Sequence, residues 1–163
     1  MTGPVPVSGD GGAEIYAKLA AMGLALPEVV PPLAAYVPAV QSGNYVYVSG
    51  QLPFVEGKLP YVGKLGAEVT VEQGAELART CALNALGAIE ALVGLGRVVK
   101  IVKVTGFVAS APGFTGQPAV VNGASELFGE VLGEIGRHAR SAVGVAELPL
   151  GAPVEVEVIA EVA

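Results

Sequence analysis

The chain has 163 residues, of which 52% are hydrophobic and 15% are charged, and this length and composition suit one domain with a full apolar core. Its formal net charge of −6 disfavours nonspecific binding to nucleic acid, because such binding depends on clustered basic residues that neutralise phosphates. No apolar run reaches the ~18 residues that a membrane span needs, and the N-terminus lacks the basic start of a signal peptide, so we expect a cytoplasmic protein.

The first 33 residues are predicted to lie outside the main domain. Residues 1–12 are rich in Gly, Pro, Val and Ser and are typical of a loose arm. Residues 13–22 have the spacing of a short helix, and its apolar face would be formed by Ile15, Leu19 and Met22. Prolines then favour an extended connector; they are Pro27, Pro31 and Pro32. We therefore predict an arm with a short helix and a proline-rich connector over residues 1–33, and one domain over 34–163.

A hairpin is predicted at the start of that domain. Residues 36–40 and 45–50 have the composition of strands, and the turn-forming residues 41–44 lie between them. Pro38 indicates that the first strand lies at a sheet edge or bulge, because proline cannot donate a hydrogen bond to a neighbouring strand. A third short strand is expected around residues 54–58.

Two long helices with a strand between them follow. Thr70 can cap a helix that runs to about Val93, and Gln73 completes a capping-box pattern. Residues 98–108 are predicted to form a strand, and residues 118–135 a second helix with an apolar stripe.

The last part of the chain predicts two strands. A strand-like run over residues 140–145 is separated by Leu148–Gly151 from a second run that begins near Val154. With the preceding elements, this order predicts an α+β fold: a mixed β-sheet with two long helices packed on one face and hairpins at both ends.

Arg140 is the main candidate for chemistry. An arginine can donate two parallel hydrogen bonds to a carboxylate, and the small residues on its strand face, such as Ala142, leave room for an anion. Glu155 on the next strand could lie across from Arg140 and orient a water molecule. Two alternatives stay open: Arg140 is a solvated surface residue, and the glutamates of the last strand form a solvent-exposed face.

Other reactive residues give weaker signals. His138 can act as an acid or base, but it is the only histidine, so a zinc site or a Cys-His dyad is poorly supported and we interpret His138 as structural. Cys81, the single cysteine, lies in a helical pattern and is interpreted as a buried apolar residue. No glycine-rich phosphate loop is present. The sequence therefore predicts neither a metal nor a cofactor.

Four segments together resemble the RidA/YjgF family of small trimeric proteins. They are residues 36–53, with Ser-Gly-Gln-Leu-Pro at the end; residues 104–108; residues 121–128; and residues 139–157, with Arg-Ser, Leu-Pro and Val-Glu in that order. The match covers about residues 34–163. The helical N-terminal extension looks like that of a divergent bacterial branch of this family.

The resemblance implies a chorismate-mutase-like fold and a homotrimer with clefts between subunits. It also implies the hydrolysis of reactive enamines and imines, such as 2-iminopropanoate and 2-iminobutanoate, to 2-oxo acids and ammonia. The arginine that binds the substrate carboxylate would be Arg140, and the glutamate that orients water would be Glu155. The other positions that would contact substrate are Tyr36, Ser49, Gly50, Gln51, Asn122 and Ala142.

The sequence departs from the pattern of the family at three places. Ala142 stands where the enamine-deaminase branch has a cysteine, and the segments after Pro53 and near residues 115–118 are longer. These changes keep a second interpretation open: a trimer without catalytic activity that binds small carboxylates or keto acids and regulates a partner. An endoribonuclease or translation inhibitor is a third, which the acidic charge and the absence of paired histidines disfavour.

Overall fold

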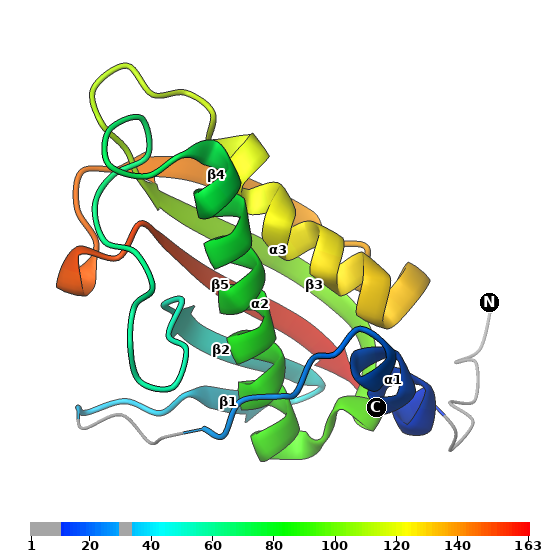
Figure 1. Ribbon diagram of the computed structural model, residues 1–163. Helices are drawn as coiled ribbons and strands as arrows, with labels where there is room; N and C mark the ends of the chain where they lie inside the picture. Colours follow the sequence, from blue (N-terminus) through cyan, green and yellow to red (C-terminus); the bar gives the residue numbers. More distant parts are fainter. Residues whose placement is uncertain (1–10, 30–33) are drawn as a thin grey trace.

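A computed structural model describes residues 11–29 and 34–163 (Figure 1). The strands are β1 (Ala39–Ser42), β2 (Tyr45–Gln51), β3 (Val98–Ala109), β4 (Ala139–Val145) and β5 (Val154–Val162). The α-helices are α1 (Gly11–Ala21), α2 (Val71–Val93) and α3 (Gln117–Leu132), and the 3₁₀ turns are η1 (Leu95–Arg97), η2 (Gly133–Gly136) and η3 (Pro149–Gly151). Most of the predicted arm and part of the predicted connector lie outside the described residues.

The strands form one five-stranded sheet in the order β1-β2-β5-β3-β4. Among the neighbouring strands of this sheet in the described residues, β3 and β4 pair in parallel and the other pairs are antiparallel. The long helices α2 and α3 lie side by side across one face of the sheet (Figure 1). The predicted α+β architecture, a mixed sheet with two long helices on one face, is confirmed.

The predicted hairpin at the C-terminal end is wrong. Strand β3 lies between β4 and β5, so these two strands are not neighbours. The unit β3-α3-β4 is a parallel crossover, in which the helix returns the chain to the same end of the sheet. Strand β5 occupies the centre of the sheet because its alternate residues, from Val154 to Val162, are buried beneath the helices.

Local sequence signals explain most element boundaries. The capping box at the start of α2 is formed as predicted: the Gln73 backbone N–H donates to Thr70 Oγ1 at 3.1 Å, and the Thr70 N–H donates to Gln73 Oε1 at 2.9 Å. Strand β1 lies at the sheet edge, as Pro38 indicated, but begins only at Ala39. Its turn is shorter than expected, because Gly43 adopts a φ of 57° and lets the hairpin close over two residues.

A predicted strand and a predicted helix end are wrong. The expected strand over residues 54–58 is a tight turn closed by a single bridge between Val55 and Lys58, with Glu56 and Gly57 at positive φ. The second long helix was predicted to reach residue 135, but α3 ends at Leu132, because Gly133 leaves the helical conformation with a φ of 62°.

Helix α1 packs against the rest of the domain. Ile15 and Leu19 are buried in the same core as the sheet residues. The Tyr16 hydroxyl donates to Glu90 Oε2 at the end of α2, and that carboxylate also accepts the Leu95 N–H. In the described part of the chain, no helix combines the length and apolar character needed to cross a bilayer.

Gly123 sets how closely α3 can approach α2. A methyl group at this position would overlap the Ala75 carbonyl of α2, which belongs to the backbone and cannot rotate away. We expect Gly123→Ala to lower the free energy of unfolding by roughly 1–3 kcal/mol, the usual cost of overpacking a core. Urea denaturation followed by circular dichroism would measure it.

Gly129 provides the matched control, because it lies on the same helix with nothing within 4 Å of an added methyl group. Gly129→Ala should leave stability unchanged or raise it by up to about 1 kcal/mol, since alanine loses less backbone entropy than glycine. Equal stability of the two variants would contradict the proposed contact.

Candidate functional site

Arg140 on β4 is held by α3 through neutral oxygen atoms. Its Nη1 donates to Asn122 Oδ1 at 2.7 Å and to Ser125 Oγ at 3.2 Å, and its Nη2 lies 3.5 Å from the Pro118 carbonyl oxygen. Among the described residues, no carboxylate lies within ion-pair distance of the guanidinium. The side chain is therefore oriented by the protein while its positive charge stays uncompensated.

One edge of this guanidinium is left for a ligand. Nη1 donates to both Asn122 and Ser125 and Nη2 donates to the Pro118 carbonyl, whereas Nε has no hydrogen-bond partner among the described residues. Nε and Nη2 share one edge of the planar guanidinium group, and an edge of this kind can donate two parallel hydrogen bonds to the two oxygens of a carboxylate. Arg140, Asn122 and Ser125 are called the arginine cluster below.

The small residues beside Arg140 on β4 were expected to leave room for an anion, but the core and helix α3 pack against them. Ala142, two residues along the same strand face, packs against the apolar core. At Gly144 an added methyl group would lie 2.8 Å from Gln117 Nε2 in the first turn of α3. The small residues of β4 thus let α3 approach the sheet edge, so the space that they leave is taken up by α3 and the core.

A second group of predicted site residues gathers where β2 meets β5. A methyl group on Gly50 would overlap the Glu155 carboxylate, so glycine at this position lets the Glu155 side chain lie against β2. Ser49 Oγ donates to the Val37 carbonyl at 2.6 Å, which ties β2 to the segment that carries Tyr36. Glu155, Gly50 and Ser49 are called the glutamate cluster below.

Two more predicted residues lie beside the glutamate cluster. Gln51 Nε2 donates to the Ser49 carbonyl at 3.0 Å and braces the end of β2. Tyr36 directly precedes Val37, and its side chain is 57% exposed, so its ring is available for contact with a ligand or another chain.

The environment of Glu155 raises the pKa of its carboxyl group. Burial raises the pKa of this carboxyl group from its ordinary value, and repulsion from Glu157 on the same strand raises it further. A carboxyl group with a raised pKa is a better proton acceptor once it ionises, which is the property expected of a general base.

Because Glu157 contributes to that raised pKa, Glu157→Gln should lower the pKa of Glu155 without restoring the ordinary value, since burial is the larger cause. The raised pKa means that the folded state favours the protonated carboxyl, so the stability that Glu155 contributes is lost as pH rises through its folded-state pKa. A ¹³C NMR titration of the carboxyl signals would follow the change. Glu161→Gln, which removes a charge further along β5, is the control, and an equal shift in both variants would contradict the assignment.

The two clusters lie on opposite faces of the sheet in one chain. Val104 pairs with both Arg140 and Val158 and is buried beneath the helices, so Arg140 projects toward the helix-covered face. Phe107 pairs with Glu155 and belongs to the other face, which we call the open face. The expectation that Glu155 lies across from Arg140 on a neighbouring strand is therefore wrong, because β3 separates them.

Ser125 and His138, which sequence reasoning did not place among the site residues, are linked to the arginine cluster by hydrogen bonds. Ser125 Oγ lies 2.8 Å from His138 Nε2, and His138 Nδ1 lies 2.7 Å from the Gly136 carbonyl oxygen. The spacing held a signal: Ser125 is three residues after Asn122 on a helix, and His138 is two residues before Arg140 on an extended segment, so each shares a face with a predicted site residue.

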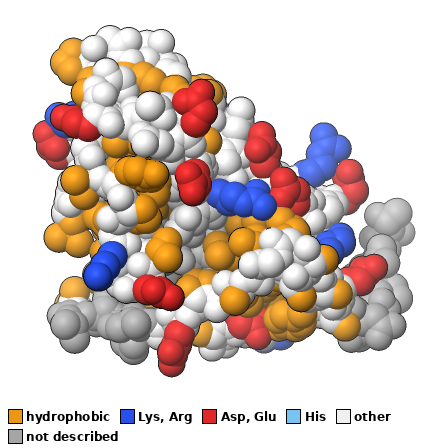
Figure 2. Space-filling model, in the orientation of Figure 1, with side chains coloured by type: hydrophobic (Ala, Val, Ile, Leu, Met, Phe, Trp, Pro, Cys, Tyr) orange, Lys and Arg blue, Asp and Glu red, His pale blue; other side chains and the backbone are white. Residues whose placement is uncertain are grey.

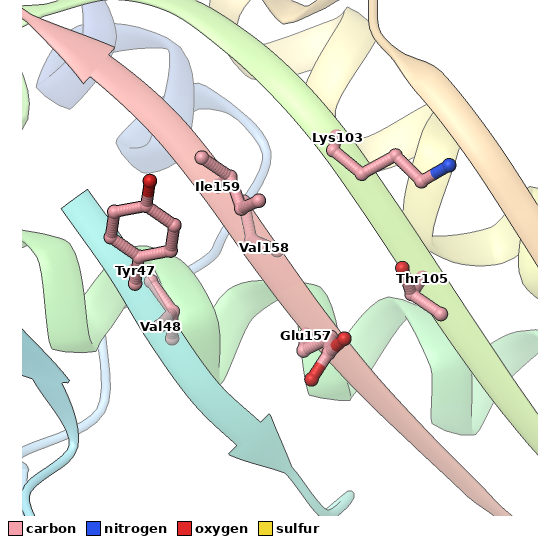
Figure 3. A pocket seen from close by; sticks show the side chains of 7 residues that line it. All are labelled: Tyr47, Val48, Lys103, Thr105, Glu157, Val158 and Ile159. Carbon is pink, nitrogen blue, oxygen red and sulfur yellow. The ribbon is translucent and has the colours of Figure 1, made fainter. Parts of the chain in front are cut away.

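The open face carries a shallow depression of about 150 Å³ (Figure 3). Its lining residues are Tyr47, Val48, Lys103, Thr105, Glu157, Val158 and Ile159. Lys103 extends from β3 toward β4, where its Nζ donates to Ser141 Oγ at 3.1 Å (Figure 3). The depression includes neither Arg140 nor Glu155, so it does not join the two clusters.

Other chemistry finds little support in the described residues. No group of three or more His, Cys, Asp or Glu side chains there could hold a metal ion. Cys81 is fully buried, and burial raises the pKa of its thiol, which disfavours a nucleophilic thiolate. On the helix-covered face, the Lys and Arg side chains of the described residues are scattered and form no continuous basic patch (Figure 2).

Comparison with known proteins agrees with this architecture. Residues 16–162 match the family described as "YjgF/chorismate mutase-like, putative endoribonuclease". Protein TCP17 from Trypanosoma cruzi is 47% identical over 90% of this chain and 93% of its own length. The crystal structure of Atu1372 from Agrobacterium tumefaciens is 43% identical, with a TM-score of 0.86 over 93% of this chain and 94% of that one.

A further solved structure is that of TdcF from E. coli with bound serine. It is 25% identical, with a TM-score of 0.58 over 84% of this chain and 93% of that one. The mixed sheet with two helices on one face is the chorismate-mutase-like form of the α+β class. The chain belongs to the YjgF/chorismate-mutase-like family, which confirms the resemblance seen in its sequence.

Proposed function

We propose that this protein hydrolyses reactive imines and enamines that carry a carboxylate, such as 2-iminopropanoate and 2-iminobutanoate, to 2-oxo acids and ammonia. The observation that carries the proposal is the uncompensated guanidinium of Arg140, oriented by neutral oxygens with one edge free. The binding of serine, a small amino acid with a carboxylate, by the related TdcF supports a site of this kind.

The chemistry needs little from the protein besides positioning. Arg140 would hold the substrate carboxylate through charge-assisted hydrogen bonds, each worth roughly 1.5–3 kcal/mol. The Glu155 carboxylate would accept a proton from a water molecule as its oxygen attacks the C=N carbon. The imine nitrogen takes up a proton from solvent, which gives the carbinolamine. The protonated Glu155 then returns its proton to that nitrogen, the C–N bond breaks as the hydroxyl group loses its proton to solvent, and ammonia and the 2-oxo acid are released. Backbone groups near Ala142 would contact the substrate nitrogen.

The separation of the two clusters supports a site shared between copies of the chain. We propose a homotrimer in which the arginine cluster of one subunit meets the glutamate cluster of its neighbour. The open face also carries exposed apolar side chains, among them Tyr45, Tyr47 and Val143, whose burial between subunits would favour association. Tyr36, exposed beside the glutamate cluster, would line the shared cleft.

The direct test is incubation with 2-iminopropanoate generated in the assay by an amino acid oxidase, with pyruvate as the product measured. We expect pyruvate to form faster than by spontaneous hydrolysis, in proportion to the protein concentration. A rate equal to that of the buffer alone would reject the proposed reaction.

Ala142 favours one alternative. The enamine-deaminase branch has a cysteine at this position, so its loss is compatible with a trimer that binds small carboxylates or keto acids without converting them and regulates a partner. Binding of 2-oxobutanoate, measured by calorimetry, without any imine hydrolysis would support this alternative. RNA cleavage is disfavoured by the net charge of −6 and the scattered basic residues.

A further inference from the structure

We propose that Ser125 and His138 are positioning residues that decide which edge of the Arg140 guanidinium is presented to a ligand. This inference rests on the proposed function, since it concerns the same carboxylate site. It follows from a continuous chain of hydrogen bonds that runs from the Gly136 carbonyl through His138 and Ser125 to Arg140.

The first step is the tautomer of His138. Its Nδ1 lies 2.7 Å from the Gly136 carbonyl oxygen, which can only accept, so Nδ1 carries the hydrogen of the neutral ring. Nε2 is then an acceptor, and the Ser125 hydroxyl, 2.8 Å away, donates to it. The ring is also held by an edge contact with Phe128, at 5.9 Å between centroids and 83° between planes.

The second step is the direction of the Ser125 hydroxyl. With its hydrogen committed to His138, its oxygen offers only lone pairs to its surroundings, and Arg140 Nη1 donates to it at 3.2 Å. Together with the bond to Asn122 Oδ1 at 2.7 Å, this engages Nη1 in two hydrogen bonds. The guanidinium therefore cannot turn its Nη1 side to a ligand without breaking two hydrogen bonds.

The same geometry argues against Ser125 as a nucleophile. A serine hydrogen-bonded to a histidine is a familiar catalytic pair, but here Ser125 lies on the Nη1 side of the guanidinium. A carboxylate bound at the Nε and Nη2 edge would lie on the other side of the group. Ser125 and His138 thus act on the ligand only through Arg140, by reducing the rotational freedom that a long arginine side chain would lose on binding.

The test compares variants that break the chain of hydrogen bonds with variants that keep it. Ser125→Ala and His138→Leu remove a link. Ser125→Thr keeps the hydroxyl, and His138→Gln keeps an acceptor oxygen near the position of Nε2. We expect the first pair to raise the Kd for 2-oxobutanoate and the KM for 2-iminopropanoate about threefold to tenfold, the range for one lost neutral hydrogen bond, with kcat within about twofold. The second pair should bind close to wild type.

A second measurement reads the position of Arg140 without any ligand. The ¹⁵N–¹H heteronuclear NOE of Arg140 Nε should indicate a rigid group in wild type, a more mobile one in Ser125→Ala and His138→Leu, and a rigid one again in the conservative variants. Circular dichroism and sedimentation would show that each variant keeps its fold and assembly, and His138→Leu tests the same chain of hydrogen bonds if Ser125→Ala does not fold.

The outcomes separate this inference from the proposed reaction. Weaker 2-oxobutanoate binding and a mobile Arg140 in the broken variants, in a protein that hydrolyses no imine, would support the positioning role and reject the deaminase. A loss of kcat with unchanged KM would overturn the positioning role, because it would place the pair in the chemical step. The positioning role would also be overturned if the heteronuclear NOE of Arg140 Nε were the same in Ser125→Ala and His138→Leu as in the wild type, or if the wild type did not bind 2-oxobutanoate.

Discussion

Arg140→Ala should lower kcat/KM for the hydrolysis of 2-iminopropanoate by a factor of about 10²–10⁴ while the protein stays folded. The free edge of the guanidinium offers two charge-assisted hydrogen bonds, each worth roughly 1.5–3 kcal/mol, and both are lost in the variant. The fold should tolerate the change, because Arg140 is only half-buried and its partners are neutral oxygens that can accept from water. A coupled assay for pyruvate would measure the rate, and circular dichroism the fold.

Arg140→Lys is the matched control for this prediction. Lysine keeps the positive charge but cannot present two parallel N–H groups, so part of the affinity should return without the full rate. Turnover by Arg140→Ala close to that of the wild type would refute the role of Arg140.

Glu155→Gln should lower kcat by about 10²–10⁴, the usual contribution of a positioned general base, with little change in KM. Glutamine has nearly the same shape but cannot take a proton from water. The wild type should lose activity as pH falls, because only the ionised carboxylate acts as a base. Since burial and Glu157 raise the pKa of Glu155, this loss should occur at higher pH than for an ordinary glutamate.

The pH profile supplies the control for Glu155. The residual activity of Glu155→Gln should no longer fall as the pH is lowered. Glu157→Gln should keep the activity, and its loss of activity (the acid limb of the profile) should occur at lower pH than in the wild type. An acid limb that persists unchanged in Glu155→Gln would assign the titration to another group.

The same two variants test whether the site is shared between subunits. If Arg140 of one subunit works with Glu155 of the next, co-expressed Arg140→Ala and Glu155→Gln chains will form some sites in which both residues are native. The mixture should then be far more active than either variant alone. Activity no higher than the average of the two variants would place both residues of each site in one chain and contradict the shared cleft.

Features that depend on a few neighbouring residues were predictable from the sequence. The hydroxyl of Thr70 and the amide of Gln73 are three residues apart, so the capping box needs nothing beyond its own turn. Pro38 marks an edge strand because the missing N–H is a property of the residue itself. The alternation of buried valines in β5 likewise indicated a strand with one face in the core.

Features that depend on strand partners were not predictable in the same way. The runs that became β4 and β5 are consecutive and looked like a hairpin, yet β4 follows α3 into a parallel pairing with β3, and β5 returns to the centre of the sheet. Nothing local distinguishes these arrangements, since either would satisfy the backbone hydrogen bonds of both strands.

The sequence by itself determined the fold class and indicated Arg140, Asn122 and Glu155 as polar residues of the candidate site, because periodicity, capping and motif order depend on neighbouring residues. Only the tertiary structure decided that Arg140 is hydrogen-bonded to Ser125, which is hydrogen-bonded to His138, and that Glu155 lies on the opposite face of the sheet. Those relations depend on where α3 packs and on which strands pair, and both are settled by contacts between residues far apart in the chain.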